Sequence, residues 1–250
     1  MKIKGFTLAE ILIALGILGA IAAMTVPQFA ANIHNQTNAS RLSAIVSDYE
    51  NIFGMMLLKE DKESLWETEF GQASNMAQMK TALEKYTKVV KTGRFSYPSC
   101  GGNNGGAVSS LIIPATYAND SPIVQSMQTF KTINGGTLNI MYVFAYSIPS
   151  GAIFFLSGNA GPTETMYIDV NGTDKPNTFG RDVFTFALGA DGHLYPYGSS
   201  KAAELLGLSN PTTQTWNNTS ASVPYRCTGT GYNGQGCTAR LIENNYKMDY

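Results

Sequence analysis

The chain has 250 residues, of which 44% are hydrophobic and only 14% are charged. Its 17 lysines and arginines nearly balance its 18 aspartates and glutamates, and this balance excludes the basic surface by which proteins attract nucleic acid. The 13 tyrosines and 12 phenylalanines exclude a disordered chain, because disordered segments are poor in aromatic residues. We expect a folded chain of one or two domains with no direct nucleic-acid site.

The first element along the chain is an apolar stretch near the N-terminus. Residues 11–40 contain no Asp, Glu, Lys or Arg, whereas Lys2 and Lys4 precede them and Glu10 lies at their edge. A helix over residues 6–26 would be roughly 31 Å long, close to the ~30 Å hydrocarbon core of a bilayer. Because basic flanks stay inside, we expect a single membrane crossing with a cytoplasmic N-terminus and an extracytoplasmic remainder.

Three classes of segment fit this stretch. A cleaved secretory signal would use the small residues 20–22 (AIA) as its cleavage site, but its apolar region should not carry a carboxylate. A plain signal anchor has the right length but gives no reason for Glu10, since an acidic residue in a membrane helix costs up to ~3 kcal/mol and usually marks function. The third class follows from the residues on either side of Gly5.

The chain begins with the sequence MKIKGFTLAEILIA, which resembles the leader of type IV prepilins and type II secretion pseudopilins. The resemblance covers residues 1–60 well and the rest only in outline. It implies that a membrane prepilin peptidase cuts between Gly5 and Phe6 and that Phe6 is then N-methylated. Glu10 and Pro27 also occupy positions that the family uses, Glu10 for assembly into a filament and Pro27 for a kink in the helix.

The chemistry of these residues agrees with that resemblance. Gly5 lets a peptidase approach the backbone, because it has no side chain. Cleavage would leave a cationic α-amine on Phe6, where an isolated charge is costly away from water. Glu10 lies one helical turn further on, so its carboxylate can face the amine of its own subunit or of a neighbour. The resemblance implies the neighbour's amine; the alternative is that Glu10 only reaches the headgroup layer.

Pro27 lacks an amide hydrogen, so we expect a bend or a locally melted stretch over residues 23–27.

Two amphipathic helical patterns follow. The apolar residues of the first recur at helical spacing and are Leu42, Ile45, Val46, Tyr49, Ile52, Phe53, Met56 and Leu57. This helix should therefore continue to about Lys59. The second helix is expected over residues 74–92, with an ion pair between Glu84 and Lys88. Residues 93–136, which are rich in Gly, Ser, Pro and Asn, are expected to form a flexible loop.

The pattern then changes to short β-branched and aromatic runs, as is typical of strands. These runs are residues 139–148, 152–156, 165–170, 183–188 and 193–197. Turn sequences at residues 149–151 and 190–192 join neighbouring runs, which favours an antiparallel meander. Residues 238–250 carry apolar side chains at helical spacing, and we expect them to dock as a short helix.

Together these elements predict an α+β, pilin-like fold in which a long N-terminal membrane-spanning helix packs against a head with an antiparallel β-sheet. The expected divisions are a leader at residues 1–5, the transmembrane part of the helix at 6–26, its outer half at 27–60 and an extracytoplasmic head at 61–250. The sequence shows no long internal repeat, which argues against a solenoid or a propeller.

One loop of the predicted head collects oxygen ligands of the kind that calcium prefers. Asp169, Asn171, Asp174 and Asp182 lie between two predicted strands. The loop fails the EF-hand pattern, because its glycine is misplaced and the closing glutamate is missing. Some pseudopilins are similar in holding calcium on a β-loop of the head. The alternative is a turn that Asx side chains stabilise without a metal.

Three cysteines lie in the part expected outside the cell membrane, where disulfides are permitted. Cys227 and Cys237 enclose a short glycine-rich segment and are predicted to form a disulfide, which leaves Cys100 free or intermolecular. Residues 229–234 match G-x-G-x-x-G, but without a βαβ unit around them we predict no dinucleotide site. The chain has only two histidines and no nucleophile elbow, H-E-x-x-H or C-x-x-C motif, so we predict that it is not an enzyme.

We expect this chain to be a structural subunit, a minor pilin or pseudopilin, of a type IV pilus or a type II secretion filament. The implied partners are other subunits, the prepilin peptidase, and an inner-membrane assembly platform with its ATPase; no cofactor other than calcium is expected. The expected location is the cytoplasmic membrane, before assembly into a periplasmic or surface filament. Two other classes stay open: a tip adhesin or binding module on a pilin anchor, served by residues 93–136 or the cysteine loop, and a membrane-anchored enzyme.

Overall fold

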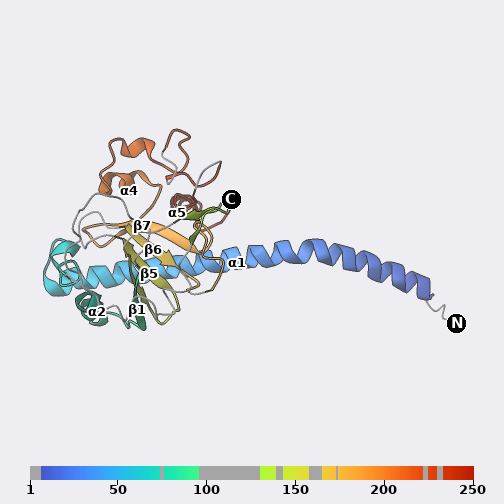
Figure 1. Cartoon of the computed structure of the whole chain (residues 1–250), viewed down its shortest axis with the longest axis horizontal. Coiled ribbons are helices and arrows are strands. Elements are labelled where there is room, and N and C mark those ends of the chain that lie inside the picture. Colours follow the sequence, from blue (N-terminus) through green and yellow to red (C-terminus); the bar gives the residue numbers. More distant parts are fainter. Residues whose placement is uncertain are drawn as a thin grey trace, which may run out of the picture.

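The structure of the chain is a computed structural model. The residues that it describes are 7–73, 76–95, 130–138, 143–157, 165–172, 174–221, 225–229 and 233–250. One long helix crosses an antiparallel sheet and projects far beyond it toward the N-terminus, and shorter helices flank the sheet (Figure 1). The α+β class expected from the sequence is confirmed.

The long helix, α1 (Leu8–Glu60), is a single element of 53 residues. It ends where Asp61 adopts a left-handed conformation, with φ 51°, and this confirms the end expected near Lys59. Of the two alternatives expected over residues 23–27, a bend or a melted stretch, the melted stretch is wrong, because Pro27 lies inside a helix that continues through it.

A single proline removes one backbone hydrogen bond but leaves those of the neighbouring turns in place. The helix therefore continues and curves gently over its projecting half (Figure 1). The Thr25 hydroxyl donates to the Ile21 carbonyl at 3.0 Å and so ties together the turn before Pro27. A backbone that satisfies its own polar groups is also what a lipid environment requires.

The outer half of α1 buries one face in the head. The buried residues on that face are Ala39, Leu42, Ile45, Val46, Tyr49, Ile52, Phe53 and Met56. They recur every three or four residues, as one face of a helix does. The ring centroid of Tyr49 lies 3.9 Å from that of Phe154, and the ring of Phe53 lies 5.6 Å from that of Phe70. The helical pattern predicted after the apolar stretch is thus confirmed and supplies part of the core.

Six strands form the main sheet in the order β1-β4-β5-β6-β7-β8, and every neighbouring pair is antiparallel. Their bounds are β1 Lys91–Phe95, β4 Val143–Ser147, β5 Ile153–Ser157, β6 Thr165–Asp169, β7 Val183–Leu188 and β8 Leu194–Pro196. A separate pair consists of β2 (Phe130–Lys131) and β3 (Thr137–Leu138). The five predicted strands correspond to β4 through β8, and the predicted antiparallel meander is confirmed.

The pairing register lines up the side chains that face α1. The residues of this row are partners across β4 to β7 and are Tyr146, Phe154, Ile168 and Phe184. All of them share one core with the outer half of α1. Because alternate strand residues point to opposite faces, this row determines which face of the sheet the helix covers. The β7–β8 turn also touches the helix: a Cβ added to Gly192, at φ 80°, would lie 2.9 Å from the Cβ of Phe53.

The second predicted helix is shorter than expected. It is α2 (Met76–Glu84); residues 85–90 belong to no helix, and Lys91 begins the strand that pairs with β4. Because α2 ends at Glu84, its i,i+4 ion pair is Lys80–Glu84 at 3.5 Å. The expected pair between Glu84 and Lys88 is wrong, since Lys88 lies beyond the helix.

The loop expected over residues 93–136 is only partly described. Residues 93–95 belong to β1 and residues 130–131 to β2, while residues 96–129 lie outside the described residues. The remaining short elements are η1 (Leu65–Glu67), α4 (Ser200–Leu205), η3 (Pro211–Thr213) and α5 (Cys237–Glu243). The short helix expected near the C-terminus is therefore present as α5.

Candidate functional site

The projecting half of α1 exposes an almost continuous apolar surface. Its large apolar side chains over residues 8–33 are 47–76% exposed. The helix is long and apolar enough to cross a membrane, and none of its most apolar window is buried against the head. A folded protein rarely leaves so large an apolar surface in water, because each Å² costs roughly 25 cal/mol. The expectation of one apolar N-terminal helix of membrane-spanning length is confirmed.

Glu10 lies at the start of this surface and is held by Thr7. The Glu10 carboxylate accepts the backbone amide and the hydroxyl of Thr7, both at 2.8 Å, while the Glu10 amide donates to the Thr7 hydroxyl at 3.3 Å. This reciprocal arrangement is a capping box, which satisfies amides that the first turn of a helix leaves free. Sequence reasoning gave Thr7 no role, although Thr-x-x-Glu is the signal of such a box. Gly5 and Phe6, the predicted cleavage and methylation residues, lie outside the described residues.

The four residues predicted as a calcium site extend from Asp169, the last residue of β6, to Asp182, the residue before β7. Asp169 and Asp182 are fully buried, Asn171 is half-buried and Asp174 is exposed. Asp182 Oδ2 accepts the side-chain amide of Asn171 at 3.1 Å and the backbone amide of Asn177 at 2.9 Å. Within the described residues, no three His, Cys, Asp or Glu side chains are grouped to hold a metal ion. The fold thus brings together Asp169, Asn171 and Asp182 and leaves Asp174 at the surface.

Both buried carboxylates organise the loop through backbone amides. Asp169 Oδ1 accepts the amides of Asn171 and Gly172 at 3.1 and 3.0 Å, which is an Asx turn. Asp182 Oδ1 accepts the amide of Thr178 at 2.5 Å. The Asx-stabilised turn, which the sequence offered as the alternative to a metal site, is therefore present.

The electrostatics of this loop are unfavourable to two negative charges. Burial raises the pKa of Asp169 well above its usual range, and the charge of Asp182 raises it further. Burial also raises the pKa of Asp182, although amides of the loop oppose this shift. In the part of the chain that the structure describes, Asp169 Oδ2 and Asn171 Oδ1 are buried and have no hydrogen-bond partner. Neither acceptor therefore receives a hydrogen bond from the described residues of the loop.

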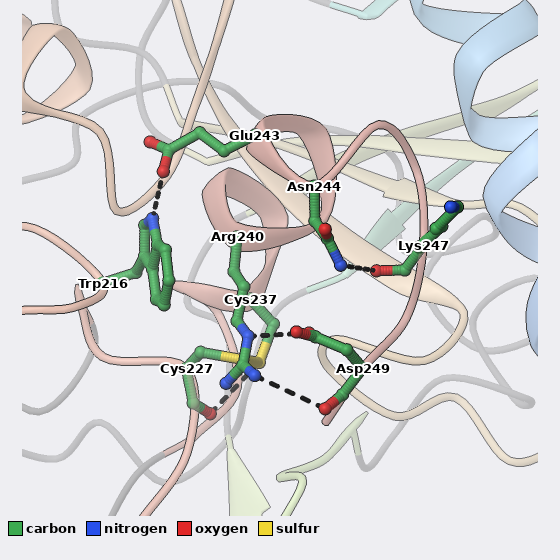
Figure 2. A network of polar contacts seen from close by, with 8 residues as sticks. All are labelled: Trp216, Cys227, Cys237, Arg240, Glu243, Asn244, Lys247 and Asp249. Carbon is green, nitrogen blue, oxygen red and sulfur yellow. Dashed lines mark hydrogen bonds and ion pairs between the residues drawn. A yellow bond between two sulfur atoms is a disulfide. The ribbon is translucent and has the colours of Figure 1, made fainter.

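The C-terminal residues form a second polar cluster, built around a disulfide (Figure 2). Cys227 and Cys237 are bonded, with their Cα atoms 4.2 Å apart, and this bond ties the preceding loop to the start of α5. Cys100 lies outside the described residues. Among the described residues no strand leads into the segment 229–234, so its G-x-G-x-x-G match lacks the strand that a dinucleotide site needs.

Arg240 lies at the centre of this cluster. Its guanidinium carbon is 5.4 Å from the ring centroids of both Trp216 and Tyr250, and its Nε donates to Asp249 Oδ1 at 2.8 Å. The hydrogen bond from Arg240 lowers the pKa of Asp249. Trp216 Nε1 donates to Glu243 at 2.7 Å (Figure 2). These contacts hold the C-terminal tail on the head, and we assign them a structural role.

Two side chains of α1, Asn38 and Glu50, make polar contacts with the head. The side-chain amide of Asn38 donates to the Arg181 carbonyl at 3.3 Å and lies 3.3 Å from Nε2 of His34. Glu50 Oε1 accepts the first backbone amide of β8 at 3.1 Å and lies 3.3 Å from Nδ1 of His193. Both histidines therefore contact polar groups of α1. Sequence reasoning gave neither Asn38 nor Glu50 a role.

No protein-family model, no curated protein and no solved structure matches the chain. What supports a function is therefore the sequence of the chain and the geometry of its helix and head.

Proposed function

We propose that this chain is a structural filament subunit, a minor pilin or pseudopilin of the type IV pilus or type II secretion kind. It inserts with its N-terminus in the cytoplasm, is cut after Gly5, is methylated on Phe6 and assembles through α1 with the help of a membrane platform and its ATPase. Its head lies on the extracytoplasmic side of the membrane, and the assembled filament is periplasmic or at the cell surface. We assign it no catalytic activity.

The observation that carries this proposal is the division of α1 into two environments. The same continuous helix exposes its large apolar side chains over residues 8–33 and buries one face in the core over residues 39–56. A secretory cut after residues 20–22 would leave Met24 and Phe29 as exposed apolar side chains on the released head. A membrane helix that is continuous with the core instead suits a subunit whose helices bundle inside a filament while its heads lie outside.

The capping box supports the proposal at the cut end of the helix. In the cut chain Thr7 would be the second residue, so the new amine of Phe6 would lie one peptide unit from the box. The Glu10 carboxylate is already directed at that end, because it accepts the Thr7 amide. Pairing this carboxylate with an amine, its own or a neighbour's, removes the cost of a lone charge in lipid.

Replacing Gly5 with leucine tests the first step of the proposal. Leucine puts a branched side chain where a peptidase must approach the backbone, so we expect Gly5→Leu to be cut roughly 100-fold more slowly and to accumulate as precursor. Immunoblots that separate precursor from mature chain measure the effect.

Gly16→Leu is the matched control for this experiment. Gly16 lies on the exposed part of α1, and apart from its chain neighbours and the nearby backbone of its own helix no atom lies within 4 Å of a Cβ added to it, so the variant should be cut normally. Normal maturation of Gly5→Leu would assign the segment to an ordinary signal peptidase and would end the proposal.

A further inference from the structure

The length of the apolar helix determines how far the head lies from a membrane. The uncharged stretch begins after Glu10, and a helix that enters a ~30 Å hydrocarbon core at Ile11 leaves it after about 20 residues. The headgroup layer adds ~5–7 Å, so α1 reaches its outer edge at about residue 35. Asn38 is already fully buried in the head. The head therefore begins within one helical turn of the headgroups.

Two arginines lie at this end of the head. The side-chain amide of Asn38 donates to the Arg181 carbonyl at 3.3 Å, which places Arg181 where α1 leaves the head. Arg41 is exposed on α1 one turn beyond Asn38. The next acidic residue along α1 is Asp48, which lies two turns further from the membrane-spanning part. Both arginines are therefore close to the level of the headgroups.

The C-terminal tail brings a third basic residue to the same end. Tyr246 packs on the core beside Ser43 of α1, and Lys247 next to it is exposed. The acidic residue of the tail, Asp249, pairs with Arg240 at 2.8 Å, so these two charges offset each other. Figure 1 shows the C-terminus at the end of the head from which the projecting part of α1 emerges. Lys247 thus adds to the positive charge there.

The exposed charges of the neighbouring loop do not change this balance. Asp174 and Lys175 are adjacent and exposed, and their charges are opposite. Arg41, Arg181 and Lys247 therefore leave a net positive charge, and we call these three residues the basic end of the head.

The other end of the head has the opposite balance. It contains the end of α1 and the turn after it, far from the projecting part (Figure 1). Acidic residues outnumber basic ones in this segment, which contains Glu60, Asp61, Glu63, Glu67 and Glu69 against Lys59 and Lys62. The head is therefore polarised along the helix axis, with its positive end toward the membrane. An anionic surface on that side would favour this orientation and repel the reverse one.

We propose that the basic end of the head binds the anionic headgroups of the phospholipid surface from which α1 emerges. The inference rests on the membrane-spanning helix of the proposed function, but it does not need the cut after Gly5. Each lysine or arginine beside an anionic lipid surface strengthens binding about fivefold, and the attraction fades within a Debye length of about 8 Å. Docking of this kind would hold the head on the membrane before the filament takes up the subunit.

The test uses the full-length chain in lipid nanodiscs of phosphatidylcholine, alone or mixed in equal amounts with phosphatidylglycerol. Hydrogen exchange read by mass spectrometry should slow roughly tenfold at the amides of residues 244–250 in the anionic discs. Exchange in α2, at the other end of the head, should not change. Sodium chloride at about 0.5 M shortens the Debye length to about 4 Å and should remove the difference. Equal exchange of residues 244–250 in both discs, or a difference that survives the salt, would overturn the proposal.

A double variant, Arg41→Gln with Lys247→Gln, tests which residues carry the contact. Both side chains are exposed, so the core stays intact. The difference between the two discs should shrink to within about twofold, because two of three attractive charges are gone. Lys59→Gln with Lys62→Gln is the matched control, since it removes the same charge from the other end of the head and should keep the full difference. A full difference in the first pair, or its loss in the control pair, would contradict the assignment.

The outcome is distinguishable from failure of the filament proposal. A chain that inserts into both discs without any effect of lipid charge would overturn the docking and leave the filament proposal standing. Normal maturation of Gly5→Leu would instead end the filament proposal, while a charge-dependent difference in the discs would still support the docking.

Discussion

Filaments formed with a Glu10→Ala chain are expected to contain roughly one hundredth of the native amount of this subunit. Alanine removes the carboxylate that would neutralise the amine of Phe6 and leaves that charge alone in an apolar helix, at a cost of about 3 kcal/mol. Cutting after Gly5 should be unchanged, because the substitution lies beyond the cut. Quantitative immunoblots of sheared filaments against the membrane fraction measure the incorporated share.

Two matched variants separate the charge of Glu10 from its capping role. Glu10→Gln keeps an acceptor for the Thr7 amide but removes the charge, so we expect the same loss of incorporation as with alanine. Thr7→Ala removes the capping hydroxyl but keeps the charge, so incorporation should fall only about fivefold. Native incorporation of Glu10→Ala or Glu10→Gln would remove the role of counter-charge and leave Glu10 as a helix cap.

Phe154→Ala is expected to lower the free energy of unfolding of the head by about 3–5 kcal/mol. Phe154 is fully buried, and its ring centroid lies 3.9 Å from that of Tyr49 and 5.2 Å from that of Tyr146. It therefore joins the sheet to α1, and its loss leaves a cavity between two elements that cannot close it. Unfolding of the full-length chain in detergent, followed by near-ultraviolet circular dichroism, measures the change.

Phe29→Ala is the matched control for Phe154→Ala. It removes the same side chain from the projecting half of α1, where Phe29 is 68% exposed, so the stability of the head should change by less than about 0.5 kcal/mol. If Phe154→Ala unfolds like the native chain, the packing of α1 on this face of the sheet is contradicted.

The parts of the fold that could be predicted are those whose buried faces repeat with the period of their element. Residues 42–56 repeat like a helix, and the five predicted runs became β4 through β8. The end of the second helix could not be predicted, because Lys91–Phe95 pairs with β4 far along the chain, and that pairing overrides local helical spacing. At Pro27 the sequence predicted a bend or a melted stretch, but a single missing backbone hydrogen bond does not interrupt α1.

The candidate sites could be predicted only in part, for the same reason. Composition pointed to the loop between β6 and β7, but Asp174 and Asp169 look equivalent in sequence, and only the folded loop makes one exposed and the other buried. Asn38 and Glu50 contact groups 143 and 144 residues further along the chain, so no local pattern could indicate them. Thr7 differs from these, since its capping signal was present in the sequence.

The identity of the first residue in the protein purified from its own membrane tests the filament proposal most directly. Mass spectrometry of the N-terminal peptide should show a chain that begins at Phe6 and carries a methyl group on its α-amine. A mature chain that begins at Met1, after residues 20–22, or at any residue other than Phe6 would contradict the proposal.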